Sequence, residues 1–222
     1  MPVLTYGTIA LTVIVSFAAF YNSNLFEKYS FSVSAILQDR EYHRVITSMF
    51  LHINWVHLLF NMFALYSFGA PIESRFGVKI MLVIILYSAV AGSLLALAVN
   101  RKKPGYKAVG ASGAVCGVIF ASIFLLPGGS VIVFPVPVPV PAWLYGVLFM
   151  VISLYGIGRG GSNIGHEAHL GGALAGIAWA VLYEPSIIEK NAALLAGLTL
   201  PVVILLLYFI VYKKTPGDES HP

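Results

Sequence analysis

Apolar residues in this chain gather in seven long stretches, separated by short segments that carry most of the glycine, proline and charge. A helix needs about 20 predominantly apolar residues to cross the hydrocarbon core of a bilayer, and most of the stretches approach this length. They lie near residues 3–21, 47–70, 79–99, 112–127, 141–158, 166–183 and 192–212. The pattern predicts an all-α membrane protein.

The polar segments predict how these helices are connected. Residues 21–44 interleave aromatic and charged side chains, which favours a segment in the headgroup region over a free linker. Residues 69–77 read as a short solvated turn, in which Glu73 and Arg75 either pair or cap helix ends. Residues 131–141 alternate valine and proline over much of their length, and the missing N–H groups predict an extended conformation.

Composition agrees with a multi-pass membrane protein. Of the 222 residues, 59% are hydrophobic and 10% are charged, whereas a soluble domain carries about a quarter charged residues. The net charge of +4 comes from residues near segment ends, which is typical of anchoring in a lipid bilayer and not of a nucleic-acid surface. A single cysteine, Cys116, excludes an internal disulfide and any cysteine-based metal motif. Residues 3–21 lack the basic start and small-residue end of a signal peptide, so we expect a retained span.

The fourth stretch opens on a serine between glycines, in the sequence Gly110-Ala111-Ser112-Gly113. If a helix begins at Ser112, its roughly 15 residues rise about 22 Å, less than the ~30 Å of the hydrocarbon core. Its N-terminus would then lie below the membrane surface, where free N–H groups and the helix dipole favour a developing oxyanion. Ser112 is therefore a candidate nucleophile, and the alternative is a serine that merely caps its helix.

The sixth stretch brings histidines to a matching depth. His166 and His169 are three residues apart and share a helix face, a spacing that differs from the four of the zinc-protease motif. No third ligand is evident, so we expect neither a metal nor another cofactor. His169 is the candidate base for Ser112. Glu167 lies on a different face of the helix, so the sequence predicts a Ser–His dyad and not a triad.

Small residues follow both candidates at helical spacing. The stripes consist of Gly113, Gly117 and Ala121 in the fourth stretch and of Gly172, Gly176 and Ala180 in the sixth. Such patterns let two helices approach closely in lipid. If the two stripes face each other, Ser112 and His169 meet near the same end of the bundle.

The second stretch supplies further polar groups, His52, Asn54, His57 and Asn61. His57 and Asn61 are four residues apart, point the same way, and lie about midway along the predicted helix. Both can donate hydrogen bonds, as an oxyanion hole requires, although interhelical hydrogen bonding is the simpler role. Stretches two, four and six run in the same direction, so their polar groups are expected to converge on one water-accessible pocket.

At this point the sequence resembles the rhomboid family of intramembrane serine proteases. Four motifs appear in the family's order over about residues 40–183. They are G-x-S-G at Gly110–Gly113, A-H-x-x-G-x-x-x-G at Ala168–Gly176, H-x-x-x-x-H-x-x-x-N at His52, His57 and Asn61, and G-x-x-x-E-x-x-x-G at Gly69, Glu73 and Gly77.

The resemblance implies roles for these residues. Ser112 would be the nucleophile and His169 the general base and acid. His57, Asn61 and the Ser112 N–H would form the oxyanion hole, with His52, Gly110, Gly113 and Gly172 in support. The substrates would be transmembrane segments of other proteins, cut near small residues where their helices unwind. The implied fold is one domain over 1–222, with a six-helix core at about 3–183 and an extra helix at about 192–212.

Two positions depart from the family pattern. His43-Arg44 stands where Trp-Arg is frequent before the second span. Cys116 stands four residues after the nucleophile, where an aromatic side chain commonly stacks on the catalytic histidine. The dyad survives this change, which affects only what is expected of the orientation of the His169 ring.

Charge and resemblance give opposite membrane orientations. Ten of the thirteen Lys and Arg residues lie on the side where the pocket should open, which the positive-inside rule places in the cytoplasm. The family relation implies the outer side of a plasma (inner) membrane. The oligomeric state stays open.

Two other functions fit parts of the pattern. The first is a catalytically inactive rhomboid-like protein that binds or escorts membrane proteins. The second is a haem or metal protein that uses His57 and His169 as ligands.

Overall fold

The computed structural model describes residues 1–132, 138–159 and 165–211, and these are almost entirely helical. The long helices are α1 (Val3–Tyr21), α5 (Trp55–Ala64), α7 (Val78–Asn100), α8 (Ser112–Leu125), α9 (Ala142–Arg159), α10 (His166–Tyr183) and α12 (Ala192–Val211). The short helices are α2 (Ser23–Tyr29), α3 (Val33–Leu37), α4 (Arg44–Thr47), α6 (Ala70–Phe76) and α11 (Ile187–Lys190), with a 3-10 turn η1 (Ser48–Phe50) and a π-helical turn η2 (Leu65–Gly69). The predicted all-α fold is confirmed.

Two small antiparallel strand pairs complete the described chain. Strand β1 (Phe31–Ser32) pairs with β2 (Lys107–Ala108), and β3 (Ser130–Ile132) pairs with β4 (Pro139–Pro141). The extended conformation predicted for residues 131–141 is therefore confirmed at both ends, while residues 133–137 lie outside the described part of the chain.

Most predicted spans agree with the helices. Within the described residues, Val3–Tyr21, Trp55–Phe76 and Val78–Asn100 are long and apolar enough to cross a bilayer. The apolar helix α8 is shorter, beginning at Ser112 as predicted, and its 14 residues rise about 21 Å. A helix of this length is shorter than the hydrocarbon core of a bilayer.

The second span was placed too early in the sequence. It begins at Trp55, not near residue 47, because the side chain of Asn54 accepts the His57 N–H at 2.8 Å and caps the helix there. The preceding residues form α4 and η1 instead. The span then continues through η2 into α6, beyond residue 70. His57 consequently lies in the first turn of the helix and not midway along it.

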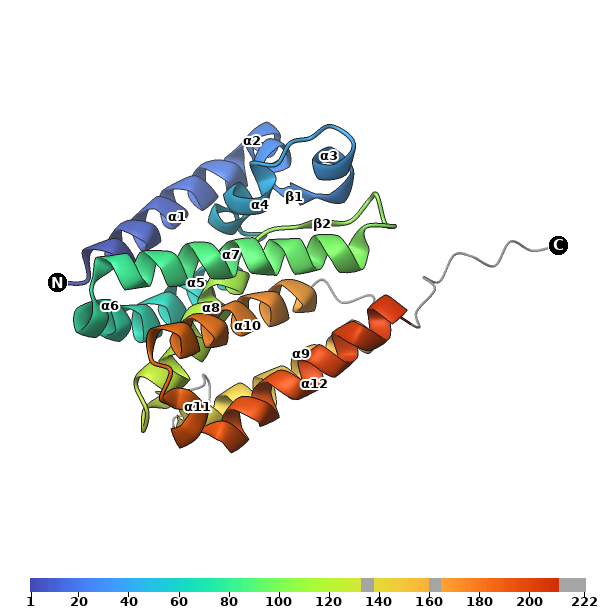
Figure 1. The fold of residues 1–222 in the computed structure, drawn as a ribbon. Coiled ribbons are helices and arrows are strands. Elements are labelled where there is room, and N and C mark those ends of the chain that lie inside the picture. Colours follow the sequence, from blue (N-terminus) through green and yellow to red (C-terminus); the bar gives the residue numbers. More distant parts are fainter. Residues whose placement is uncertain (133–137, 160–164, 212–222) are drawn as a thin grey trace.

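Helix α8 lies in the interior of the bundle and packs against both α7 and α10, which also pack against each other (Figure 1). Every residue of α8 after Ser112 is buried, because protein surrounds the helix on all sides. The predicted glycine contact is confirmed: a methyl group at Gly172 would overlap the Gly113 carbonyl, and one at Gly176 would overlap the Gly117 carbonyl. The adjacent Gly171 faces α7, where a Cβ would lie 2.7 Å from the Ala91 carbonyl oxygen. Gly171 and Gly172 thus let the backbone of α10 approach that of α7 on one side and that of α8 on the other.

Residues 22–47 fold into a compact unit beside α7 and are not a free linker. The Arg44 guanidinium is buried and donates to the carbonyl oxygens of Glu27 and Ser30 at 2.6 and 2.7 Å. It also pairs with Glu41 at 2.5 Å. His43, the first residue of the His43-Arg44 pair noted in the sequence, packs edge-on against Tyr29 with ring centroids 5.9 Å apart.

The interpretation of residues 69–77 as a solvated turn is wrong. This segment continues the helix through α6, and Glu73 is 3% exposed. Its carboxylate accepts the Leu4 N–H at 2.8 Å, the Thr5 N–H at 2.7 Å and the Thr5 hydroxyl at 2.6 Å. Glu73 therefore caps the first turn of α1, whose free N–H groups carry the positive end of the helix dipole. Of the two roles predicted for Glu73, capping of a helix end is the one that the structure shows, and the capped residue Thr5 lies 68 residues away in the sequence.

Replacing Glu73 by glutamine is expected to lower the free energy of unfolding by about 2–3 kcal/mol, because an amide retains at most part of these charge-assisted hydrogen bonds. SDS titration of the protein in detergent micelles measures the change. Glu189→Gln on α11, where the side chain is exposed, is the matched control and should change the value by less than about 0.5 kcal/mol. Equal stability of the two variants would contradict the capping role.

Candidate active site

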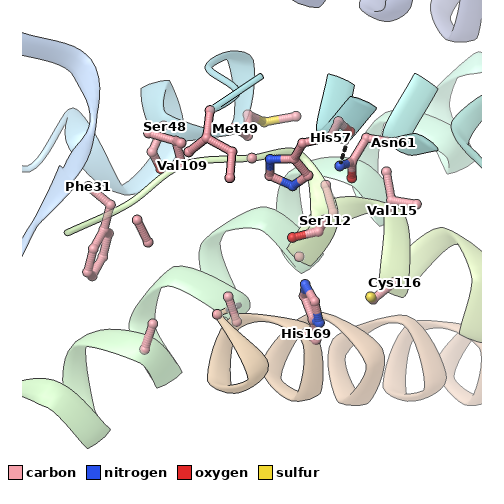
Figure 2. A pocket seen from close by; sticks show the side chains of 18 of the residues that line it. Phe31, Ser48, Met49, His57, Asn61, Val109, Ser112, Val115, Cys116 and His169 are labelled. Carbon is pink, nitrogen blue, oxygen red and sulfur yellow. Dashed lines mark hydrogen bonds between the residues drawn. The ribbon is translucent and has the colours of Figure 1, made fainter. Parts of the chain in front are cut away.

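One large cavity brings together most of the residues that the sequence singled out. It has a volume of about 950 Å³ and extends from α8 and α10 to the β1–β2 pair. Its lining includes His57 and Asn61 from α5, Ser112 from α8 and His169 from α10. Figure 2 shows these four side chains arranged around the same space, with Ser112 and His169 facing each other. The predicted convergence of the beginnings of three helices is confirmed.

Ser112 is the first residue of α8 and does not cap it. The N-cap residue is Ala111, and no side chain accepts a hydrogen bond there. The alternative of a serine that serves only as a helix cap is therefore wrong. The hydroxyl lies at the helix N-terminus together with the N–H groups of the first turn, where the helix dipole favours negative charge.

Gly110 brings His57 close to this serine. Its φ of +133° is a backbone conformation that favours glycine. A Cβ at Gly110 would lie 2.7 Å from Cε1 of the His57 ring and 3.0 Å from Nε2. The same Cβ would lie 3.7 Å from the Ser112 Oγ. Any larger side chain would thus occupy the space between the histidine and the serine.

His52 lies behind the cavity, fully buried, and holds the segment that precedes Ser112. Its Nε2 accepts the Ala111 N–H at 3.4 Å, which leaves the proton of a neutral ring on Nδ1. That Nδ1 then donates to the Ser16 Oγ at 2.9 Å, and the Ser16 hydroxyl donates to the Phe50 carbonyl at 2.8 Å. The Gly110 N–H donates to the Ser48 carbonyl at 3.0 Å. These contacts anchor the entry to α8 on α1 and η1.

Asn61 is 7% exposed, and its amide reaches the cavity one helical turn after His57. One N–H of Nδ2 donates to the His57 carbonyl at 2.9 Å. The second N–H of the same amide is available to a ligand. The His57 ring packs edge-on against His52, with centroids 4.9 Å apart. Two donors from one face of α5 therefore flank the serine.

His169 approaches from α10, whose first turns are in backbone contact with α8. A Cβ at Gly113 would lie 3.3 Å from the Ala168 carbonyl oxygen, immediately before His169. Within the described residues, the Ser112 hydroxyl and the His169 ring share no hydrogen bond. Hydrogen bonds between catalytic groups are often long in the absence of substrate and shorten when substrate binds.

Phe149, which was not predicted as a site residue, packs directly on His169. The two ring centroids are 5.6 Å apart, with the planes tilted by 38°. Cys116 also lines the cavity and lies beside His169 (Figure 2). Phe149 is one of many aromatic residues in an apolar helix, so neither spacing nor composition distinguishes it from a lipid-facing side chain.

Other titratable groups surround the site. The His166 ring is buried against Gly156 of α9 and lies 6.1 Å from the His169 ring. Tyr106 lines the cavity near β2. Burial raises the pKa of its hydroxyl, and the negative charge of the Glu167 carboxylate raises it further. In the described ranges, no three His, Cys, Asp or Glu side chains gather as a metal site would require.

Comparison with known proteins adds a family relation to this geometry. The Rhomboid domain family matches residues 39–186. RHOMBOID-like protein 12, mitochondrial, of Arabidopsis thaliana is 38% identical over 154 residues, which cover 62% of this chain and 46% of the relative. Rhomboid protein 1, mitochondrial, of Saccharomyces cerevisiae is 32% identical, over 66% of this chain and 43% of the relative.

A bacterial relative matches nearly the whole chain. Rhomboid protease GluP of Bacillus subtilis is 27% identical over 227 residues, which cover 99% of this chain and 43% of the relative. The chain thus spans less than half the length of these three relatives. The matched residues 39–186 include His57, Asn61, Ser112 and His169.

Proposed function

Because this chain belongs to the rhomboid family, we propose that it is an intramembrane serine endopeptidase that cleaves transmembrane segments of other membrane proteins. The observation that carries the proposal is the meeting of Ser112 and His169 across one cavity, on two helices in backbone contact. The cavity lies at the beginning of α8, and the proposal requires that water and an unwound peptide meet the serine there. No cofactor enters the proposed reaction.

The proposed reaction begins with attack of the Ser112 Oγ on a backbone carbonyl carbon of the substrate, while His169 accepts the hydroxyl proton. The carbonyl oxygen becomes an oxyanion, which accepts hydrogen bonds from the Ser112 N–H, the His57 ring and the Asn61 amide. When the peptide bond breaks, His169 returns the proton to the leaving amine. Water then attacks the acyl-enzyme, with its proton passing to His169 and from there to the Ser112 oxygen.

The remaining residues would support this chemistry by position. Gly110 leaves the space through which His57 approaches the serine. Gly113 and Gly172 hold α8 and α10 at backbone distance. His52 fixes the segment before Ser112 through its contact with the Ala111 N–H. In the dyad reading, no carboxylate is needed to orient His169.

Replacing Asn61 by alanine is expected to lower kcat by roughly 10²–10³, because one oxyanion donor is lost while the dyad remains. KM for a reconstituted single-span substrate should change little, since the oxyanion forms only along the reaction path. Cleavage kinetics in proteoliposomes measure both. Asn54→Ala, which removes the cap of the same helix, is the control for a purely structural effect, and equal losses in both variants would remove Asn61 from the oxyanion hole.

The chain is an integral membrane protein, and its membrane is a separate question. The relatives carry mitochondrial names in two cases and come from a bacterium in the third. The plasma (inner) membrane therefore stays a prediction of the sequence. An inactive binding or escort protein is the alternative function, and reaction of Ser112 with a fluorophosphonate probe separates the two.

A further inference from the structure

The ring of His169 is held by packing. Phe149 of α9 and His166 of α10 are its ring neighbours, with centroids at 5.6 and 6.1 Å. In the described chain, no hydrogen bond from another side chain or from the backbone orients the imidazole. The rotation of the ring is therefore determined by the rings and the cavity wall around it.

This rotation matters for the proposed reaction. One ring nitrogen has to reach the Ser112 hydroxyl and later the leaving amine, within about 3 Å in each case. In a Ser–His–Asp triad a carboxylate fixes the imidazole from behind. Glu167, two residues before His169, does not play this part. Its carboxylate accepts a hydrogen bond from the Asn100 amide at 3.3 Å. A packed aromatic ring is the restraint that the structure offers.

Phe149 is itself held firmly. Its ring contacts Phe120 of α8 at 5.9 Å and Tyr145 of its own helix at 6.0 Å. Gly146 lets α9 come close to α8, since a Cβ there would lie 2.7 Å from Cδ1 of Ile123. One turn beyond Ser112 on α8, the Cys116 side chain has no ring that could pack on the imidazole. The ring of Phe149, from α9, packs on it instead.

We propose that Phe149 is a positioning residue, which orients the His169 ring toward Ser112 from a different helix than the one that carries the serine. The inference rests on the proposed protease function. If Phe149 has this role, the orientation of the His169 ring depends on how α9 packs against α8 and α10. Glycine contacts hold the helices of Ser112 and His169 together, whereas Phe149, the nearer of the two ring neighbours of His169, comes from a third helix.

Steady-state cleavage of a reconstituted single-span substrate tests the inference. Phe149→Leu keeps an apolar side chain without the ring. In this variant kcat is expected to fall roughly tenfold with KM within twofold, which corresponds to the interaction free energy of one ring–ring contact. Phe149→Tyr keeps the ring and should retain kcat within twofold. Leu148→Ala, on the exposed face of α9, is the matched control and should also retain kcat within twofold.

The outcomes separate the two proposals. If wild-type protein cleaves and Ser112→Ala does not, the protease function stands, and unchanged kcat in Phe149→Leu then overturns the role of Phe149. A tenfold fall in Phe149→Tyr as well overturns it, because the ring is present there. If Ser112→Ala cleaves like the wild type, the protease function itself fails. Thermal unfolding of each variant in micelles shows whether a fall in kcat comes with a loss of folded protein.

Discussion

Replacing Ser112 by alanine is expected to lower cleavage of a reconstituted single-span substrate by about 10⁴-fold or more, to the background of the assay. The physical reason is that no other hydroxyl takes its place at the beginning of α8, where the first-turn N–H groups face the cavity. His169→Ala should have an effect of the same size, because a serine hydroxyl is a weak nucleophile without a base.

Matched controls exist for both variants. Ser122 lies on the same helix, buried, with its hydroxyl donating to the Ile119 carbonyl at 2.6 Å, so Ser122→Ala should leave cleavage unchanged. His43→Ala removes an exposed histidine of the segment before η1 and should do the same. The double variant Ser112→Ala/His169→Ala should be no slower than either single variant, because the two residues act as one unit.

The contrary results are equally clear. Full cleavage by Ser112→Ala would rule out Ser112 as the nucleophile. Normal binding of a membrane protein by a wild-type chain that neither cleaves it nor reacts with a fluorophosphonate would favour the inactive escort protein. A visible absorption band or bound metal in purified wild-type protein would favour the haem or metal alternative.

Replacing Gly176 by alanine is the second large expected effect, and it concerns stability. The new methyl group would overlap the carbonyl of Gly117, and backbone atoms cannot rotate aside as a flexible side chain does. Helices α8 and α10 would have to separate along their whole contact. Overpacking of a core costs about 1–3 kcal/mol, and we expect a loss near 3 kcal/mol in the free energy of unfolding, measured by SDS titration in micelles.

The same substitution at an open glycine is the control. A Cβ at Gly7 on α1 or at Gly197 on α12 meets no atom within 4 Å, so Gly7→Ala and Gly197→Ala should be neutral or slightly stabilising. Because Ser112 and His169 sit at one end of this helix pair, Gly176→Ala should also lower kcat more than either control. Unchanged stability in Gly176→Ala would mean that α8 and α10 are not in backbone contact.

Much of the architecture could be predicted from local patterns. The helices α1, α7, α10 and α12 were predicted almost to the residue, because long apolar runs leave few alternatives in lipid. The start of α8 at Ser112 follows from the glycine-rich segment before it. The facing of Gly113 with Gly172 and of Gly117 with Gly176 followed from small residues at helical spacing, which identifies the faces that approach most closely.

The two errors have different causes. The beginning of α5 was missed because the apolar residues Met49, Phe50 and Leu51 seemed to continue the span toward residue 47, whereas the cap at Asn54 determines the boundary. Residues 69–77 were taken for a solvated turn because charge usually indicates solvent, whereas Glu73 is buried against the N-terminus of α1. The Asn54 cap is local, with a partner three residues away, whereas Glu73 binds a partner 68 residues away.

From the sequence alone it follows that this chain spans a membrane as helices, and that a hydroxyl, an imidazole and amide donors stand in the first halves of three spans that run in the same direction. These follow from periodicity and spacing, which are properties of neighbouring residues. The folded chain alone shows that Glu73 caps α1, that His52 holds the segment before Ser112, and that Phe149 lies against His169. Those three contacts join residues 68, 59 and 20 positions apart, and the packing of whole helices, not the local pattern, determines which side chains meet.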